Sequence, residues 1–121
     1  MTVAGLRFQR FDFGTIRIDG VDYDYDLVID RGDIRKRRKK ASKQYRDDFG
    51  HTPLSLAEEI PWNCRRLVVG TGAEGSLPVM DEVRAEASER EVELAVVPTA
   101  RAIQLLNQGG KRTNAIIHVT C

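Results

Sequence analysis

The sequence predicts an α/β fold with three layers, in which an N-terminal β meander joins a parallel βαβαβ core. In the second half of the chain, apolar strand-like runs alternate with helical stretches, at residues 65–69, 79–90, 92–97, 100–107 and 113–120. Short strand–helix–strand connections imply right-handed crossovers, and therefore parallel strands. The first half instead contains short strand-like segments separated by turn residues. With 121 residues, one domain spanning 1–121 is expected.

The opening meander is predicted from three segments, at residues 6–12, 14–19 and 23–30. Asp22, Asp24 and Asp26 alternate with apolar or aromatic neighbours, which is the period of a half-buried strand. We therefore expect these carboxylates to form a solvated face. Residues 30–33 spell D-R-G-D and are predicted to be a plain turn rather than an adhesion motif.

The connection between the halves is predicted to be mostly irregular. Residues 35–50 are polar and lack a strong apolar period, so we expect an exposed strand followed by a loop. Thr52 and Pro53 then resemble the cap and first position of a short helix over residues 53–59. Later, Thr99 is predicted to cap the helix at residues 100–107.

Charge is unevenly distributed along a chain whose formal net charge is +1. Residues 31–46, here called the basic arm, contain nine basic residues and one acid, so the remainder has a net charge of −7. Nucleic-acid binding through residues 35–43 is disfavoured because aromatic side chains are absent until Tyr45 and Phe49. A solvated loop, or a patch that meets a protein partner or a second copy, fits better. The candidate patch comprises Arg35, Lys36, Arg37, Arg38, Lys39 and Lys40.

Several classes of protein are excluded or disfavoured by composition. No stretch approaches the roughly 20 apolar residues of a membrane span, and no secretory signal is visible at the N-terminus. Cys64 and Cys121 are too few for a disulfide framework, and with His51 and His118 they show no metal-ligand spacing. We therefore expect a cytoplasmic protein without a metal, a cofactor or a membrane partner.

A glycine loop at residues 70–76 follows the first parallel strand and reads G-T-G-A-E-G-S. Its G-x-G-x-x-G pattern matches the dinucleotide-binding fingerprint, but Pro78 lies where the helix that such a site requires would already have begun. No acid follows the second strand at Val97 to hold a ribose. The dinucleotide interpretation is therefore rejected.

The same loop remains a candidate site for a small anion. Its glycines can serve simply as a tight turn, or its backbone amides can form an anion nest. Ligands in open α/β sheets lie beyond the carboxyl ends of the strands, where these segments would converge. A carboxylate at Cys121 would oppose an anion unless it turns away. The candidate ligand-binding residues are Gly70, Thr71, Gly72, Gly75, Ser76, Thr99 and His118.

A nucleophilic dyad of His118 and Cys121 is disfavoured by strand alternation, which directs these side chains to opposite faces. A packed, hydrogen-bonded His118 is the favoured interpretation. No catalytic residue is assigned from the sequence.

The second half of the chain resembles the Mth938-like domain family, a domain of unknown function. The first matching segment is residues 67–77, L-V-V-G-T-G-A-E-G-S-L. The second is residues 98–107, P-T-A-R-A-I-Q-L-L-N, in which Pro98, Thr99, Ala102 and Asn107 match. The third is residues 115–121, A-I-I-H-V-T-C. The strand-rich residues 16–32 also fit this family. The resemblance implies a three-layer fold and no established reaction. It also implies kinship with a mitochondrial factor for assembly of respiratory complex I and with a cytosolic protein linked to adipogenesis.

Two functions remain open from the sequence, with nucleic-acid binding as a weaker third. The first, which the sequence favours, is a non-enzymatic interaction or assembly module that acts through another protein or a second copy. The second is a protein, which could be an enzyme, that binds a small anionic ligand through residues 70–76, Thr99 and His118.

Overall fold

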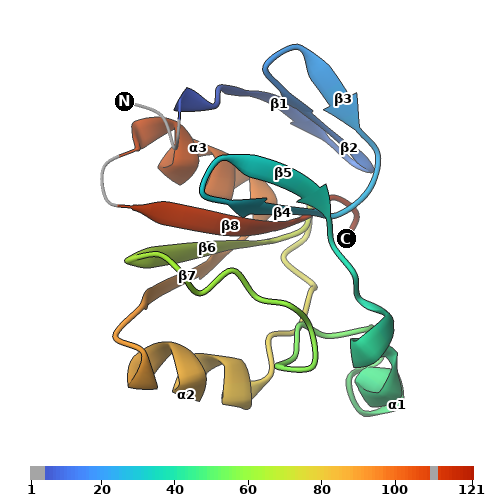
Figure 1. The fold of residues 1–121 in the computed structure, drawn as a ribbon. Coiled ribbons are helices and arrows are strands. Elements are labelled where there is room, and N and C mark those ends of the chain that lie inside the picture. The colour runs from blue at the N-terminus through green and yellow to red at the C-terminus, as the bar shows by residue number, and fades with distance from the viewer. Residues whose placement is uncertain (1–4, 110–111) are drawn as a thin grey trace.

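The computed structural model describes residues 5–109 and 112–121 and has the predicted α/β architecture. Its first three strands are β1 (Phe8–Asp12), β2 (Thr15–Ile18) and β3 (Val21–Tyr23), which form an antiparallel meander. Five further strands form the central sheet in the order β5-β4-β8-β6-β7 (Figure 1). They are β4 (Leu27–Asp30), β5 (Asp33–Lys36), β6 (Arg66–Thr71), β7 (Glu93–Val97) and β8 (Thr113–His118).

The parallel part of the central sheet matches the prediction. β6 pairs in parallel with both β7 and β8, and the connecting helices are α2 (Asp81–Glu89) and α3 (Thr99–Gln108). The sheet is mixed rather than wholly parallel, because β4 joins β8 in antiparallel orientation and brings β5 with it. The carboxyl ends of β5, β6 and β8 and the amino end of β4 therefore meet at one edge.

Two apolar layers enclose the central sheet and produce the three-layer form visible in Figure 1. On one face, the meander and α3 bury side chains such as Ile16, Leu106 and Ile117. On the other face, α2 and the segment before β6 bury Leu54, Val69 and Val83, among others. Within the described residues, no helix is both long enough and apolar enough to cross a membrane.

The predicted strand at residues 23–30 is wrong, because the chain breaks there and enters two different sheets. β3 ends at Tyr23 in the meander, whereas β4 begins at Leu27 in the central sheet. Asp26 lies at this crossing and is buried, so it does not belong to a solvated carboxylate face. Period-2 alternation continues through the break and therefore gives no sign of the change of sheet.

The segment at residues 35–50 is more regular than predicted. After β5 it forms a 3-10 helix, η2 (Lys40–Tyr45), and the short helix α1 (Arg46–Phe49). The helix expected at residues 53–59 is absent, because Leu54 is held extended in a bridge with Val79. Tertiary pairing there overrides the local cap signal of Thr52 and Pro53.

The expected cap at Thr99 is also wrong. Pro98 is the N-cap of α3, and Thr99 is the first helical residue. Its hydroxyl makes contacts outside the helix, which become important at the candidate site.

Candidate functional site

A row of ionisable side chains crosses three neighbouring strands at the edge where they meet. Leu27 lies opposite both Lys36 and Ile117 in the two antiparallel ladders. One step beyond these pairs, Asp26 therefore lies between Arg37 and His118. The Asp26 carboxylate accepts from Arg37 Nη1 at 3.0 Å and lies 2.8 Å from His118 Nδ1.

This row is buried and joined to a second carboxylate. The side chains of Arg37 and Asp26 are 1% and 8% exposed. Arg37 also binds Glu58 in a bidentate pair, with both N–O distances at 2.8 Å. Ser42 of η2 donates to the same carboxylate at 2.6 Å. Glu58 therefore fixes both the start of the basic arm's helical part and the guanidinium beside Asp26.

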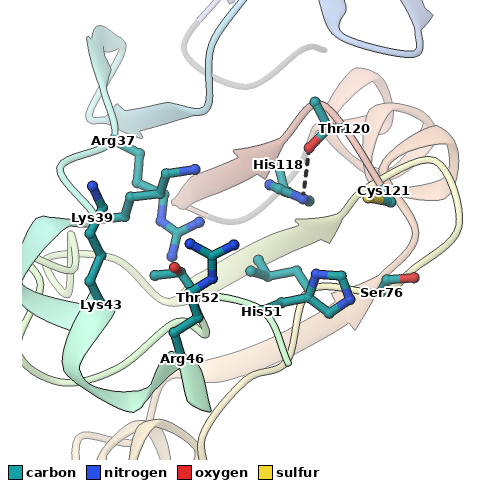
Figure 2. A pocket seen from close by; sticks show the side chains of 11 residues that line it. Arg37, Lys39, Lys43, Arg46, His51, Thr52, Ser76, His118, Thr120 and Cys121 are labelled. Atoms are coloured by element: carbon teal, nitrogen blue, oxygen red, sulfur yellow. Dashed lines mark hydrogen bonds between the residues drawn. The ribbon is translucent and has the colours of Figure 1, made fainter. Parts of the chain in front are cut away.

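Anchoring the arm in this way places it across a pocket of about 320 Å³. Figure 2 shows that one wall comes from the basic arm and the other from the ends of the parallel strands. We call it the cationic pocket. Its lining residues are Arg37, Lys39, Lys43, Arg46, His51, Thr52, Ser76, Leu77, His118, Thr120 and Cys121.

Three of the cations around the pocket are not neutralised by the protein. Lys39, Lys43 and Arg46 are exposed, and none of them forms an ion pair within residues 5–109 and 112–121. Arg37, in contrast, is compensated by two carboxylates. The free charge in the pocket therefore belongs to the outer part of the arm, where it can meet a ligand.

Backbone amides of the glycine loop are used inside the protein. Ala73 N–H donates to the Thr120 backbone oxygen at 2.7 Å, and Ser76 N–H donates to that of Cys121 at 2.9 Å. The amide of Gly75 donates to Gly72, and that of Leu77 donates to Thr71. The loop thus holds the chain after β8 and presents the Ser76 side chain to the pocket.

Thr99 has a related internal role. Its hydroxyl accepts from Gly72 N–H at 2.8 Å and donates to the His118 backbone oxygen at 2.6 Å. The hydroxyl thereby links the ends of β6 and β8 to the start of α3. Gly70 permits this contact, since a Cβ there would lie 2.9 Å from the Thr99 hydroxyl oxygen.

The predicted ligand-binding residues therefore divide into two groups. Ser76 and His118 line the pocket. The others lie behind it and hold the strand ends together; they are Gly70, Thr71, Gly72, Gly75 and Thr99. The Cys121 backbone oxygen turns toward Ser76 N–H, at 2.9 Å.

The candidate basic patch is also divided by the fold. Arg37 points inward, and Lys39 lines the cationic pocket. Arg35 contacts Asp30 and the Glu59 backbone oxygen. Arg38 and Lys40 line a different, open groove. Lys36 Nζ lies 5.3 Å from the centre of the Tyr25 ring. The fold therefore distributes the six cations among several different surroundings.

Sequence reasoning misses most of the pocket wall. Arg46, His51, Thr52 and Thr120 line the pocket but are not among the predicted ligand-binding residues. Asp26, which contacts His118 without lining the pocket, is not among them either. An available signal is the antiparallel register, which places Asp26 opposite His118 if residues 27–30 are paired with the last strand. Within the described residues, no group of three or more His, Cys, Asp and Glu side chains is arranged to hold a metal.

The network changes the ionisation of Asp26. Burial alone would raise its pKa, but hydrogen bonds from His118 and Val119 N–H, with the charges of His118 and Arg37, together lower the pKa. A carboxyl group with a lowered folded pKa stabilises the fold above its unfolded pKa of about 3.9, and this stabilisation is lost as pH falls through the folded pKa.

We expect Asp26→Asn to lower the free energy of unfolding by about 2 kcal/mol near pH 6. The difference from the parent protein should shrink as the pH falls through the lowered folded pKa of Asp26, where its carboxylate becomes protonated as well. Urea unfolding at a series of pH values measures both effects. A difference that stays constant over this range would show that Asp26 does not stabilise the fold through its charge.

Comparisons with known proteins agree with this fold. The family described as "Protein of unknown function (DUF498/DUF598)" matches residues 8–118. The crystal structure of conserved hypothetical protein PH1505 from Pyrococcus horikoshii OT3 is 32% identical, with a TM-score of 0.76. That match covers 95% of this chain and 99% of the other.

Two further structures are similar over most of their length. The structure named MT938 is 26% identical, with a TM-score of 0.72, and the match covers 97% of this chain and 100% of that one. A Bordetella pertussis protein described as a Mth938-like domain is 18% identical with a TM-score of 0.62, covering 98% of this chain and 89% of that one. The second likeness concerns the fold alone. No curated protein matches this chain.

Proposed function

We propose that this chain, which belongs to the DUF498/DUF598 family of unknown function and forms a Mth938-like domain, binds a small anionic molecule in the cationic pocket. The observation that supports this most strongly is the convergence of Lys39, Lys43 and Arg46 on one cavity without carboxylate partners among the described residues. Uncompensated positive charges in one cavity create a positive potential that raises the local concentration of anions and favours their binding.

The chemistry of the pocket wall supports a phosphate or carboxylate group as the recognised part. Hydroxyl groups of Thr52, Ser76 and Thr120 line the pocket beside the cations and can donate hydrogen bonds. The cavity of about 320 Å³ lies at the lower end of the range for ligand sites. We therefore infer a ligand of metabolite size rather than a polymer.

Inorganic phosphate should bind saturably to the parent protein, and the double variant Lys43→Met with Arg46→Met should weaken this binding by roughly tenfold or more, or about 1.4 kcal/mol. Isothermal titration calorimetry at low salt measures the affinity. Because the charges are exposed, added sodium chloride should also weaken binding.

The matched control removes the same net charge elsewhere. Arg84 of α2 and Arg101 of α3 are exposed and do not line the cationic pocket. Arg84→Met with Arg101→Met should therefore leave phosphate binding nearly unchanged. An equal loss in both double variants would point to a general charge effect and would contradict a site in the pocket.

The second candidate is a non-enzymatic interaction or assembly module. Phe13 and Val21 favour it, because they belong to the meander region and are 65% and 50% exposed, and neither of them lines the cationic pocket. Isolated apolar side chains of this kind are common on protein surfaces, so they support this function less than the gathered cations support the first. If phosphate, citrate and nucleotides all fail to bind, an interaction module becomes the better account.

A further inference from the structure

A carboxylate, an imidazole and a hydroxyl lie in series at the wall of the cationic pocket. Asp26 is 2.8 Å from His118 Nδ1, and Thr120 Oγ1 is 3.2 Å from His118 Nε2. Figure 2 shows the second contact, with the Thr120 hydroxyl and the His118 ring facing each other. The order of groups is that of an acid–base–nucleophile triad.

Hydrogen-bond chemistry fixes which way the protons lie. An ionised carboxylate can only accept, so His118 Nδ1 carries the hydrogen that Asp26 receives. In the neutral ring, Nε2 then has a free lone pair. Thr120 Oγ1–H is the donor that meets it at 3.2 Å. His118 is therefore held in the tautomer that a general base requires.

A buried carboxylate lies directly behind the histidine. Asp26 is 2.8 Å from His118 Nδ1 and is itself held by Arg37, which also contacts Glu58. The imidazolium formed when Nε2 takes up a proton from Thr120 would therefore be paired with the Asp26 carboxylate during the reaction.

We propose that the cationic pocket hydrolyses small carboxylic esters that carry an anionic group, with Thr120 as the nucleophile and His118 as its general base. Thr120 Oγ1 bonds to the ester carbonyl carbon while its proton moves to His118 Nε2. The bond to the leaving alcohol then breaks, and His118 gives the proton to the departing oxygen. Water attacks the resulting acyl-threonine, passes a proton through Nε2 to Thr120 Oγ1, and releases the acid.

The substrate's anionic group is held by the cations already described, so this inference rests on the proposed function. Lys39, Lys43 and Arg46 lie on the wall opposite His118 and Thr120 (Figure 2). Binding there would orient the ester toward the hydroxyl, and orientation of this kind accounts for much of enzymatic rate enhancement. The cations would thus select anionic esters, and Thr120 and His118 would carry out the hydrolysis.

The test uses two chromogenic acetate esters, one of a carboxy-nitrophenol, which is anionic, and para-nitrophenyl acetate, which is neutral. The parent protein should release one nitrophenolate per molecule in a burst and should carry an acetyl group on Thr120 by tandem mass spectrometry. Thr120→Val and His118→Ala should slow this burst by about 100-fold or more. The anionic ester should react faster than the neutral ester.

A matched control lies outside the cationic pocket. Thr15 of β2 does not line it, so Thr15→Val should keep the burst and the acetyl group. Circular dichroism and phosphate titration show whether each variant is folded and still binds an anion. Acetyl groups found only on lysines or Cys121, or a parental rate in Thr120→Val, would overturn the proposal even if phosphate binds. Acetylation of Thr120 without phosphate binding or a preference for the anionic ester would retain the triad and contradict the proposed anion site.

Discussion

Arg37→Met should lower the free energy of unfolding by about 3–5 kcal/mol, the cost typical of removing one partner from a buried ion pair. Asp26 and Glu58 would then remain buried without the guanidinium that both of them contact. Methionine fills much of the same space, so the loss would reflect charge more than an empty cavity. Chemical denaturation followed by circular dichroism measures the change.

Arg38→Met is the control for this experiment, because its side chain is exposed one residue further along the arm. We expect it to change stability by less than about 0.5 kcal/mol. Adding Glu58→Gln to Arg37→Met should recover part of the lost stability, since one uncompensated charge is removed. A loss below about 1 kcal/mol for Arg37→Met would contradict a buried pair that anchors the arm.

Gly72→Ala should destabilise the protein by about 3 kcal/mol or more, through backbone strain and a direct clash. Gly72 has φ of +100°, which L side chains rarely adopt. A Cβ at this position would lie 2.6 Å from the Cys121 backbone oxygen and 2.7 Å from that of Thr120. Because these neighbours are backbone atoms, the segment after β8 has to move.

Gly20→Ala separates the two contributions. Gly20 also has positive φ, at +80°, but a Cβ there would meet nothing within 4 Å. Strain alone should cost about 1–2 kcal/mol in that variant. Thermal and chemical unfolding of both variants give the comparison. Equal losses at Gly20 and Gly72 would show that the close approach of residues 120–121 contributes nothing to stability.

Much of the fold follows from local sequence patterns. The alternation of strands and helices after residue 65 predicts β6, α2, β7, α3 and β8, and all five occur with shifts of a few residues at their ends. Apolar runs and short connections are sufficient there, because consecutive strand–helix–strand units follow a common right-handed parallel arrangement. The turn at residues 30–33 is likewise present between β4 and β5.

The elements that sequence patterns misplace are those decided by distant contacts. Residues 53–59 have a helix start signal, but the pairing of Leu54 with Val79 holds them extended. The arm is predicted to be an exposed strand followed by a loop, whereas Arg37 and Ser42 both bind Glu58 and position helical turns after the strand. No local pattern encodes a partner that lies 16 or 21 residues away.

The candidate site shows the same division. Ser76 and His118 can be recognised because they follow parallel strands, where ligands commonly lie. Lys39, Lys43 and Arg46 can be recognised separately as part of the basic arm, but the sequence does not predict where the arm lies in the fold. Antiparallel pairing of β4 with β5 and β8 brings the two features together, since it aligns Arg37, Asp26 and His118 in one row. The glycine loop contributes by fixing the chain after His118 rather than by presenting its amides.

The most direct test of the anion site is the phosphate titration followed residue by residue through amide NMR signals. We expect saturable shifts concentrated at residues 39–52, Ser76 and residues 118–121, with one common affinity. These shifts should disappear in the Lys43→Met, Arg46→Met variant and persist in the Arg84→Met, Arg101→Met variant. Small shifts that grow linearly, or saturable shifts centred on another surface, would contradict a phosphate site in the cationic pocket.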